Sequence, residues 1–334
     1  MSVGKLPEKV RVSVGSAAVL GLTRCILDAE PTTIYLLTYT QNKCVANCAF
    51  CPQAITSKSR ADMLSRVTWP VFQTEDVVAR IRKTFQEDRI KRVCIQALNY
   101  PTVVEDVSCL VRSIRSFSDV PISVSCQPLK GEEIVNLAQI GVDRVSIALD
   151  APTKGLFEKI KGSLNKGPYA WEMHLKSLRE AVKIFGRGSV TTHLIVGLGE
   201  SEEDLVRMIQ WCVDNGIYAS LFAFTPIPGT MMEDYPRPSV GVYRRVQLAQ
   251  YLITHSIVKY DDVTFKEGHI VNFGIPRKDI EKIIETGEPF RTSGCPGCNR
   301  PYYNERPGGL IYNYPRKPSS EEIDDIKKQI GIAV

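Results

Sequence analysis

The sequence lacks a hydrophobic run long enough to cross a membrane. A transmembrane helix needs about 18 or more consecutive apolar residues, and no stretch of the chain approaches that length. The first residues, MSVGKLPEKVRVSVG, also lack the apolar core of a secretory signal peptide. We therefore expect a cytoplasmic protein with no membrane partner.

Cysteine is too scarce for a disulfide scaffold, and basic residues are too scattered for a nucleic-acid site. Ten cysteines among 334 residues fall far below the roughly 8–10% that marks disulfide-rich chains, so we expect reduced thiols unless a metal binds them. The 42 Lys and Arg exceed the 37 Asp and Glu by five and form no contiguous block. No nucleic-acid partner is expected, although an acidic protein partner is compatible with this charge.

Short β-branched apolar runs alternate with segments of helical periodicity from about residue 33 onward. The expected strands are 32–40, 92–98, 121–126, 144–150, 189–199, 218–228 and, with a weaker pattern, 263–271. The expected helices between them are 74–86, 103–117, 131–141, 169–185, 201–216 and 242–256. Regular β-then-α alternation indicates an α/β fold with a parallel sheet, and six or more units favour a TIM-type (β/α) barrel, complete or open.

The alternation divides the chain into three regions. Residues 1–31 are expected to form an N-terminal arm with one short apolar helix, and residues 32–275 the barrel. Residues 276–334 are rich in Gly, Pro, Tyr and Asn, contain a Cys-x2-Cys pair and end in a helical pattern at 321–331. We expect this last region to be a loop-rich C-terminal cap without a core of its own.

Three cysteines follow the first expected strand within eight residues: Cys44, Cys48 and Cys51. The C-terminal ends of strands carry the chemistry in (β/α) barrels, and crowded thiolates suit iron–sulfur clusters or zinc. The next residues, Pro-Gln-Ala-Ile at 52–55, are poor ligands. A three-thiolate set leaves one metal position open, as in catalytic zinc sites. A structural zinc site is the alternative interpretation.

This C-x3-C-x2-C pattern, with Phe50 before the third cysteine, resembles the radical S-adenosylmethionine (SAM) superfamily. The resemblance implies a [4Fe-4S] cluster on Cys44, Cys48 and Cys51 whose open iron binds the amino and carboxylate groups of SAM. It also implies an electron donor such as ferredoxin. Reductive cleavage of SAM would then give a 5′-deoxyadenosyl radical that abstracts hydrogen from an unactivated carbon, while the protein positions and shields the reactants.

Over about residues 32–230 the chain is most similar to the biotin synthase and lipoyl synthase branch of that superfamily. The resemblance implies that Asp150 holds the ribose hydroxyls, that Gly197 and Gly199 let the backbone approach the adenosyl group, and that Pro228 lies beside the adenine. Gln96 stands where other members have a glycine-glycine-glutamate motif. The SAM-binding residues implied in this way are Phe50, Gln96, Asp150, His193, Gly197, Gly199, Glu200 and Pro228.

Alternation along the strands predicts which side chains point into the barrel. In 144–150 the odd-numbered apolar residues face the helices, which turns Asp150 inward; capping of a following helix is the alternative role for this acid. The same argument turns Thr191 and His193 inward. For a histidine inside a barrel, hydrogen-bonded packing is a more common role than binding a ligand.

A second thiol pair, Cys295 and Cys298, lies in the C-terminal region. C-x2-C fits half of an iron–sulfur or zinc site, or a redox dithiol. Because the first motif already implies a cluster, an auxiliary iron–sulfur cluster is our first choice, zinc the second and a reactive dithiol the third. The expected ligands are Cys295 and Cys298, completed by Cys94 or Cys126, with Ser293 as a weak candidate.

The sequence predicts different orientations for Cys94 and Cys126, the two candidates for the remaining ligand. Alternation places Cys94 on the inner face of its strand and Cys126 on the outer face. The family resemblance, in contrast, implies an inward cluster ligand at the ends of both the second and the third strand. A β-bulge near Cys126 would reconcile the two signals.

A three-cysteine cluster motif combined with an auxiliary site resembles sulfur-inserting enzymes, in which the auxiliary cluster is dismantled to supply sulfur. The RTSG stretch before Cys295 looks most like one protein of the two-protein lipoyl synthases of archaea. This resemblance implies sulfur insertion at C6 or C8 of an octanoyl chain on a lysine of an acidic carrier protein, together with a second radical SAM protein. Only Cys25 precedes Cys44, which disfavours the single-protein lipoyl synthases, whose auxiliary cysteines precede the triplet.

Two alternatives remain. Biotin synthase-like insertion of sulfur into dethiobiotin is one, although Thr191 occupies the place where that family would have its third auxiliary cysteine. The other is a non-catalytic iron–sulfur or zinc protein that acts as a scaffold or electron carrier. Cleavage of SAM after reduction is expected of both enzymes but not of a scaffold.

Overall fold

A single eight-stranded sheet forms the centre of the computed structural model, which describes residues 5–331. Its strand order is β10-β9-β8-β7-β6-β2-β1-β5. Neighbours from β2 to β10 pair in parallel. These six strands are Thr33–Thr38 (β2), Arg92–Gln96 (β6), Ile122–Cys126 (β7), Arg144–Ile147 (β8), Val190–Val196 (β9) and Ile217–Ala223 (β10). The predicted α/β fold with a parallel sheet is confirmed.

The sheet is open, so the molecule is a partial barrel. Within the described part of the chain, the edge strand β10 pairs only with β9, and β5 pairs only with β1. Strand β1 (Lys9–Val12) runs antiparallel to both β2 and β5 (Val71–Gln73). The sequence predicts an arm outside the barrel for this region, with one short helix. The helix is present as α1 (Val14–Val19), but β1 joins the sheet, where Val10 and Val12 are fully buried.

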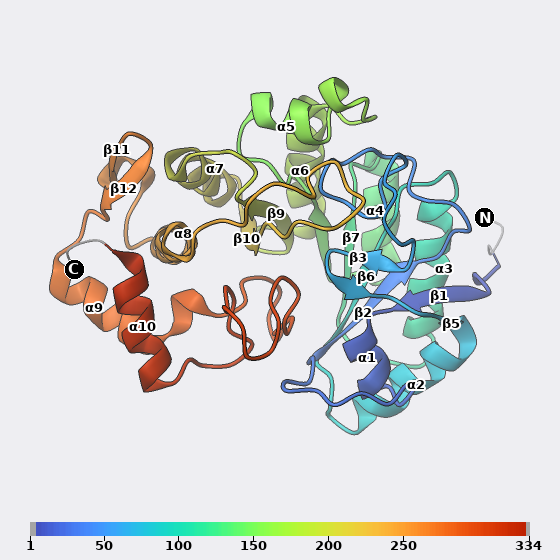
Figure 1. Cartoon of the computed structure of the whole chain (residues 1–334). Helices are drawn as coiled ribbons and strands as arrows, with labels where there is room; N and C mark the ends of the chain where they lie inside the picture. The colour runs from blue at the N-terminus through green and yellow to red at the C-terminus, as the bar shows by residue number, and fades with distance from the viewer. Residues whose placement is uncertain (1–4, 332–334) are drawn as a thin grey trace.

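Amphipathic helices follow the parallel strands and cover the outer face of the sheet (Figure 1). Helix α3, for example, buries Val107, Leu110, Val111 and Ile114, which lie at the i, i+3, i+4, i+7 spacing of one helical face. The helices are α2 (Thr74–Gln86), α3 (Val103–Arg115), α4 (Gly131–Gln139), α5 (Lys154–Ile160), α6 (Trp171–Phe185), α7 (Glu202–Asp214) and α8 (Val240–Thr254).

Two short hairpins stand apart from the main sheet. One joins β3 (Met63–Leu64) to β4 (Val67–Thr68). The other, β11 (Thr264–Lys266) and β12 (His269–Asn272), replaces the single strand expected at 263–271. Glu267 and Gly268 both have positive φ, 51° and 78°, and two such residues form the tight turn that reverses a chain into a hairpin.

The C-terminal region packs on α8 and then returns to the sheet. Helix α9 (Arg277–Thr286), the short helix η3 (Glu288–Phe290) and helix α10 (Ser320–Ile330) form the outer part, with Ile326 and Ile330 fully buried. The intervening loops reach toward β2 (Figure 1), where the Asn299 Oδ1 accepts a hydrogen bond from the Thr32 N–H at 2.9 Å. Within residues 5–331, no helix combines the length and apolarity needed to cross a bilayer.

Candidate functional site

The sheet encloses a cavity that opens to solvent. Most of its exposed lining surface is apolar, and polar side chains such as Gln96, Asp150 and His193 are set into it, a combination common in small-molecule sites. Seven of the ten cysteines belong to its walls. They are Cys44, Cys48, Cys51, Cys94, Cys126, Cys295 and Cys298.

The first cysteine group lies in the loop that follows β2. Cys44 and Cys48 are buried and Cys51 is half-buried. The Asn99 N–H donates a hydrogen bond to the Cys44 Sγ at 3.2 Å. Burial raises the pKa of Cys48 to about 12, and burial followed by the neighbouring Cys48 raises the pKa of Cys51. Such thiols lose their protons when a cation binds them, which couples metal binding to proton release.

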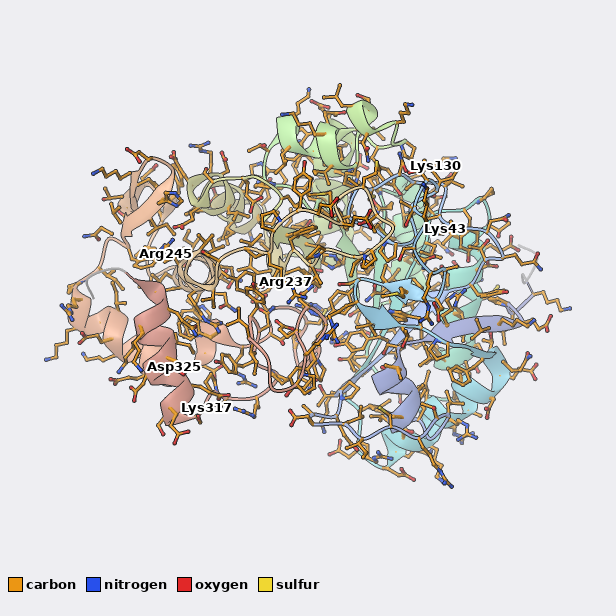
Figure 2. All side chains as sticks on the ribbon, viewed as in Figure 1. Lys43, Lys130, Arg237, Arg245, Lys317 and Asp325 are labelled. Carbon is orange, nitrogen blue, oxygen red and sulfur yellow. The ribbon has the colours of Figure 1, made fainter. Side chains whose placement is uncertain are left out.

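Lys43 holds this loop in its folded path. Its ammonium donates hydrogen bonds to the carbonyls of Pro52 at 2.9 Å, Ser57 at 2.6 Å and Ser59 at 2.8 Å. Figure 2 shows Lys43 on the side of the molecule that carries the N-terminal half of the sheet. Lys43, which precedes Cys44, thus holds the segment 52–59 that follows Cys51. These hydrogen bonds fix the path of the cysteine loop without a bound ligand.

The second cysteine group joins β6 to the C-terminal loops. In the strand register, Cys94 lies between Tyr35 of β2 and Ser123 of β7. The Cys298 Sγ lies 3.1 Å from the Tyr35 Oη, and the Cys295 Sγ lies 3.3 Å from the Ser123 Oγ. Burial raises the pKa of Cys94, and the nearby thiols of Cys295 and Cys298 raise it further. Three thiols from distant parts of the sequence therefore converge.

Cys126, the alternative to Cys94 as the completing ligand, lies apart from these three thiols. Its Sγ contacts the carbonyl of Ser146 at 3.6 Å. Its pKa is raised to about 12 by burial and then by Glu133 of α4, with no contribution from another cysteine. Pairing between β7 and β8 continues through Cys126 and Ile147 without a register shift. No bulge therefore interrupts the end of β7, and Cys126 belongs to the cavity wall there without joining the three converging thiols.

Ser293, the weak candidate for a cluster ligand, contacts the backbone of the sheet. Its Oγ accepts a hydrogen bond from the Leu221 N–H at 2.9 Å, so it ties the C-terminal loop to the edge strand β10. This contact does not include any of the three converging thiols. Ser293 therefore links the C-terminal loop to the sheet through its hydroxyl.

Both cysteine groups have the donor chemistry of an iron–sulfur site. Among residues 5–331, no three His, Cys, Asp or Glu side chains close on one point as they would around a single metal ion. Each group nevertheless brings three thiols to the wall of one cavity. Thiolate-only donor sets are typical of iron–sulfur clusters, and a cluster spreads its ligands over several iron atoms. We conclude that the donor chemistry suits a cluster in each group.

Four of the eight predicted SAM-binding residues line the cavity: Phe50, Gln96, Asp150 and His193. Asp150, just beyond β8, has a positive φ of 68°, a conformation that aspartate tolerates better than most residues. Its Oδ2 accepts a hydrogen bond from the buried Lys161 ammonium at 2.7 Å. Lys161 also donates to the carbonyl of Ala148 at 2.6 Å. The carboxylate is thus held at the cavity wall with its charge balanced.

His193 has the packing role that strand alternation suggested for an inward histidine. Its Nε2 lies 3.2 Å from the Ser146 Oγ, and its ring centroid lies 4.7 Å from that of Phe222. Burial lowers the pKa of His193 to about 4, although Asp150 acts in the opposite direction. The imidazole is therefore neutral at pH 7 and can exchange a hydrogen bond with a bound ligand or with Ser146.

The other four predicted SAM-binding residues do not line the cavity. The Glu200 carboxylate accepts hydrogen bonds from the N–H groups of Gly197 at 2.6 Å and Leu198 at 2.9 Å. Gly197 and Gly199 have φ values of +105° and +115°, which only glycine adopts readily. These residues shape the turn after β9. Pro228 is likewise outside the cavity wall, which is formed near there by Ile195, Phe224 and Thr225.

Sequence reasoning missed several residues of the site. Tyr35 and Ser123 could have been found, because alternation puts them on the same face of the sheet as Cys94. Arg300 and Asn304 could not, since they come from an irregular loop. The Arg300 guanidinium lies 3.8 Å from the ring centroid of Phe222, and the buried Asn304 Oδ1 has no hydrogen-bond partner. Both side chains line the cavity and offer polar contacts to a ligand.

Comparison with known proteins gives one family and a set of distant relatives. The Radical SAM superfamily model matches residues 38–212. A biotin synthase from Chlamydia pneumoniae is 25% identical over 245 residues, which cover 70% of this chain and 68% of that protein. A biotin synthase from Acidothermus cellulolyticus is 23% identical over 275 residues, which cover 75% and 78%.

Among solved structures, methylornithine synthase (PylB) superposes with a TM-score of 0.52 at 14% sequence identity. The match covers 66% of this chain, and the chain spans only 62% of that structure. At this identity the likeness concerns the fold alone. It agrees with an open sheet of parallel strands covered by helices.

Proposed function

This chain belongs to the radical SAM superfamily, and we propose that it is a sulfur-insertion enzyme of the lipoyl synthase type. The proposed reaction inserts sulfur at C6 or C8 of an octanoyl chain that is attached to a lysine of a carrier protein. One observation carries the proposal: two separate groups of three cysteines line the same cavity. A radical SAM enzyme needs only the first group for its SAM cluster, so the second group is free for a sulfur-supplying cluster.

In the first group, Cys44, Cys48 and Cys51 would hold a [4Fe-4S] cluster with one iron open to SAM. When bound, the cluster and SAM supply reductive cleavage of the sulfonium and hydrogen-atom abstraction from an unactivated carbon. Lys43 keeps the cysteine loop in place through its three carbonyl contacts. Asp150, oriented by Lys161, would accept hydrogen bonds from the ribose hydroxyls of SAM.

In the second group, Cys94, Cys295 and Cys298 would hold the auxiliary cluster. The wall of the cavity that both groups line includes the apolar side chains of Leu37, Leu98, Ile195, Phe222 and Phe224. An apolar wall suits a saturated acyl chain and excludes water from the reacting carbon. These features support an octanoyl substrate, because its reactive carbons carry neither charge nor hydrogen-bonding groups.

Insertion of sulfur into dethiobiotin is the second candidate, and the similarity to two biotin synthases favours it. The side chains of the site favour the lipoyl type instead. Thr191 lines the cavity where biotin synthases would have an auxiliary cysteine, and a C-terminal loop supplies thiols to the second group. The proposed partners are an octanoylated carrier protein, a second radical SAM protein and an electron donor such as ferredoxin.

Turnover under anaerobic conditions tests the proposal. The reconstituted protein is incubated with reductant and SAM, and with either an octanoylated carrier domain or dethiobiotin, each with and without a second radical SAM protein. We expect 5′-deoxyadenosine and a carrier that gains sulfur, detected by mass spectrometry. Thiolated dethiobiotin with an unchanged carrier would support the second candidate, and failure to cleave SAM would contradict both.

Two variants separate the roles of the cysteine groups in this assay. Cys44→Ala should abolish formation of 5′-deoxyadenosine, because the SAM cluster loses a ligand. Cys295→Ala should retain SAM cleavage but yield no thiolated product. Equal sulfur insertion by Cys295→Ala and the unmodified protein would contradict a role for the second group as the sulfur source.

A further inference from the structure

Two hydroxyl groups of the sheet lie against the two thiols of the C-terminal loop. The Tyr35 Oη is 3.1 Å from the Cys298 Sγ, and the Ser123 Oγ is 3.3 Å from the Cys295 Sγ. Both distances are within hydrogen-bonding range for sulfur. Each loop cysteine therefore has its own hydroxyl partner, supplied by a different strand.

The direction of these hydrogen bonds follows from the protons available. A cysteine that binds metal does so as a thiolate and has no proton to donate, so the hydroxyl must be the donor. The Ser123 Oγ also accepts a hydrogen bond from the Arg92 Nη1 at 3.0 Å, which leaves its own proton for Cys295. The Tyr35 phenol likewise has one proton to donate, and the Cys298 Sγ lies 3.1 Å from its Oη.

The loop that carries the two thiols is tied to the sheet on both sides. Asn299 accepts a hydrogen bond from the Thr32 N–H just before β2, at 2.9 Å. Ser293 accepts one from the Leu221 N–H in β10, also at 2.9 Å. The four residues from Cys295 to Cys298 thus lie between two fixed points. Their distances to Tyr35 and Ser123 are consequently set by the sheet rather than by a freely moving loop.

We propose that Tyr35 and Ser123 are positioning residues that donate hydrogen bonds to the ligand sulfurs of Cys298 and Cys295 and so set the reduction potential of the auxiliary cluster. This inference rests on the proposed function, which assigns a cluster to the second cysteine group. A hydrogen bond to a ligand sulfur withdraws electron density and stabilises the reduced cluster. Removal of either hydroxyl should therefore make the potential more negative.

The test uses the full chain with Cys44, Cys48 and Cys51 replaced by Ala, so that only the second cluster is observed. After anaerobic reconstitution, iron and sulfide are quantified and the midpoint potential is measured by redox titration followed by visible absorption and EPR. Tyr35→Phe and Ser123→Ala are each expected to shift the potential to more negative values without loss of iron. Ser123→Thr, which keeps a hydroxyl, should restore the unmodified potential.

Matched controls use Tyr303→Phe and Ser125→Ala. Both residues line the same cavity, but within the described part of the chain neither hydroxyl hydrogen-bonds a cysteine sulfur, so neither substitution should move the potential. Equal potentials in Tyr35→Phe, Ser123→Ala and the parent protein, at equal iron content, would overturn the inference and leave the second cluster in place.

Absence of iron from the parent protein itself would instead contradict the proposed function, and the inference with it. If Tyr35→Phe loses its fold, judged by circular dichroism, the smaller Ser123→Ala change still decides the question. A negative shift in Ser123→Ala that is reversed in Ser123→Thr would support the proposal.

Discussion

At the scale of single residues, Lys161 is a buried lysine that depends on one carboxylate. Its side chain is fully inaccessible, and its ammonium lies 2.7 Å from the Asp150 Oδ2. Removing one partner of a buried ion pair costs about 3–5 kcal/mol, because the other charge stays buried and uncompensated. We expect Lys161→Met to lower the free energy of unfolding by about that amount and to weaken SAM binding, measured by denaturant titration and calorimetry.

Lys154→Met is the matched control for this change. Lys154 pairs with Glu172 at 2.5 Å, but both side chains are more than half exposed. An exposed pair contributes about 0–1 kcal/mol, so the control should lose little stability. Equal effects of the two substitutions would contradict the assigned role of Lys161.

His174 makes the stability of the protein depend on pH. Its pKa is lowered to about 2 by burial and then by the positive charge of Lys161, whereas an unfolded histidine has its usual value of about 6.5. The unfolded chain therefore binds a proton below pH 6.5 that the folded chain does not. Stability should fall as the pH drops below about 6.5, by up to about 1.4 kcal/mol per pH unit from this one group.

Unfolding in urea at pH 7 and at pH 5 tests this prediction. His174→Gln, which cannot take up the proton, should show a smaller loss of stability between the two pH values than the unmodified protein. His193 contributes with the same sign, because burial lowers its pKa to about 4. An identical pH dependence in His174→Gln and the unmodified chain would show that His174 is not the buried neutral group described.

At the scale of elements, the turn after β10 supports the first cysteine loop. The Gly229 carbonyl accepts hydrogen bonds from the Lys58 N–H at 2.8 Å and the Ser57 hydroxyl at 3.1 Å. A Cβ on Gly229 would lie 2.5 Å from the Ser59 backbone nitrogen, and its φ is +83°. Gly229→Ala should therefore displace the segment held by Lys43, lower stability by about 1–3 kcal/mol and reduce the iron retained by the first group.

Gly155→Ala in α5 provides the control, because a Cβ there meets no atom within 4 Å. Alanine is favoured over glycine inside a helix by about 0.5–1 kcal/mol, so this change should be neutral or stabilising and should leave iron content unchanged. Iron analysis of both variants, alongside urea unfolding, separates damage to the cysteine loop from general instability.

Strand periodicity was the most informative signal in the sequence for this fold. It located all six parallel strands and turned Cys94 and Asp150 toward the cavity, because one face of each strand must meet the helices. It also placed Cys126 outward, where the family resemblance implied the opposite; in the structure Cys126 belongs to the cavity wall at the end of β7. A sequence motif, in contrast, does not reveal that the Glu200 carboxylate accepts hydrogen bonds from the N–H groups of its own turn.

Contacts between distant segments could not be predicted in the same way. Strand β1 is a run of only four residues, Lys9–Val12, and its place beside β2 depends on tertiary pairing rather than on local pattern. Cys298 and Tyr35 are 263 residues apart in the sequence, and Cys298 lies in an irregular loop. No periodicity encodes such a loop, so the sequence left Cys94 and Cys126 as alternatives, and the structure brings Cys94 near Cys295 and Cys298.

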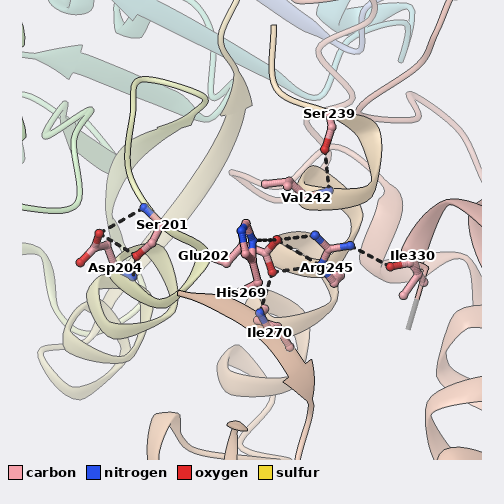
Figure 3. Close-up of polar contacts among 9 residues, drawn as sticks. All are labelled: Ser201, Glu202, Asp204, Ser239, Val242, Arg245, His269, Ile270 and Ile330. Atoms are coloured by element: carbon pink, nitrogen blue, oxygen red, sulfur yellow. Dashed lines mark hydrogen bonds and ion pairs between the residues drawn. The ribbon is translucent and has the colours of Figure 1, made fainter. Parts of the chain in front are cut away.

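At the scale of the whole molecule, one buried carboxylate ties the C-terminal region to the barrel (Figure 3). Glu202 of α7 has a side chain 1% exposed and pairs with Arg245 of α8. It also accepts a hydrogen bond from the Ile270 N–H of β12 at 2.9 Å. Arg245 in turn donates to the carbonyl of Ile330, at the end of α10, at 2.9 Å. Four elements therefore meet at this ion pair.

Loss of this carboxylate should loosen the C-terminal region. We expect Glu202→Ala to lower the free energy of unfolding by about 3–5 kcal/mol, because the largely buried Arg245 loses its carboxylate partner, and to speed amide hydrogen exchange in α10. Glu281→Ala removes the exposed partner of Arg277 and should cost less than about 1 kcal/mol. Unchanged exchange in α10 of the Glu202 variant would argue against the proposed link.

The central claim is that one cavity holds two clusters on two separate cysteine groups. Anaerobic iron and sulfide analysis of three reconstituted proteins tests it most directly: the unmodified chain, the variant with Cys44, Cys48 and Cys51 changed to Ala, and the variant with Cys94, Cys295 and Cys298 changed to Ala. The account predicts that each variant folds and retains about half of the iron of the unmodified chain. A folded variant of either kind that binds no iron, or one that keeps all of it, would contradict the account.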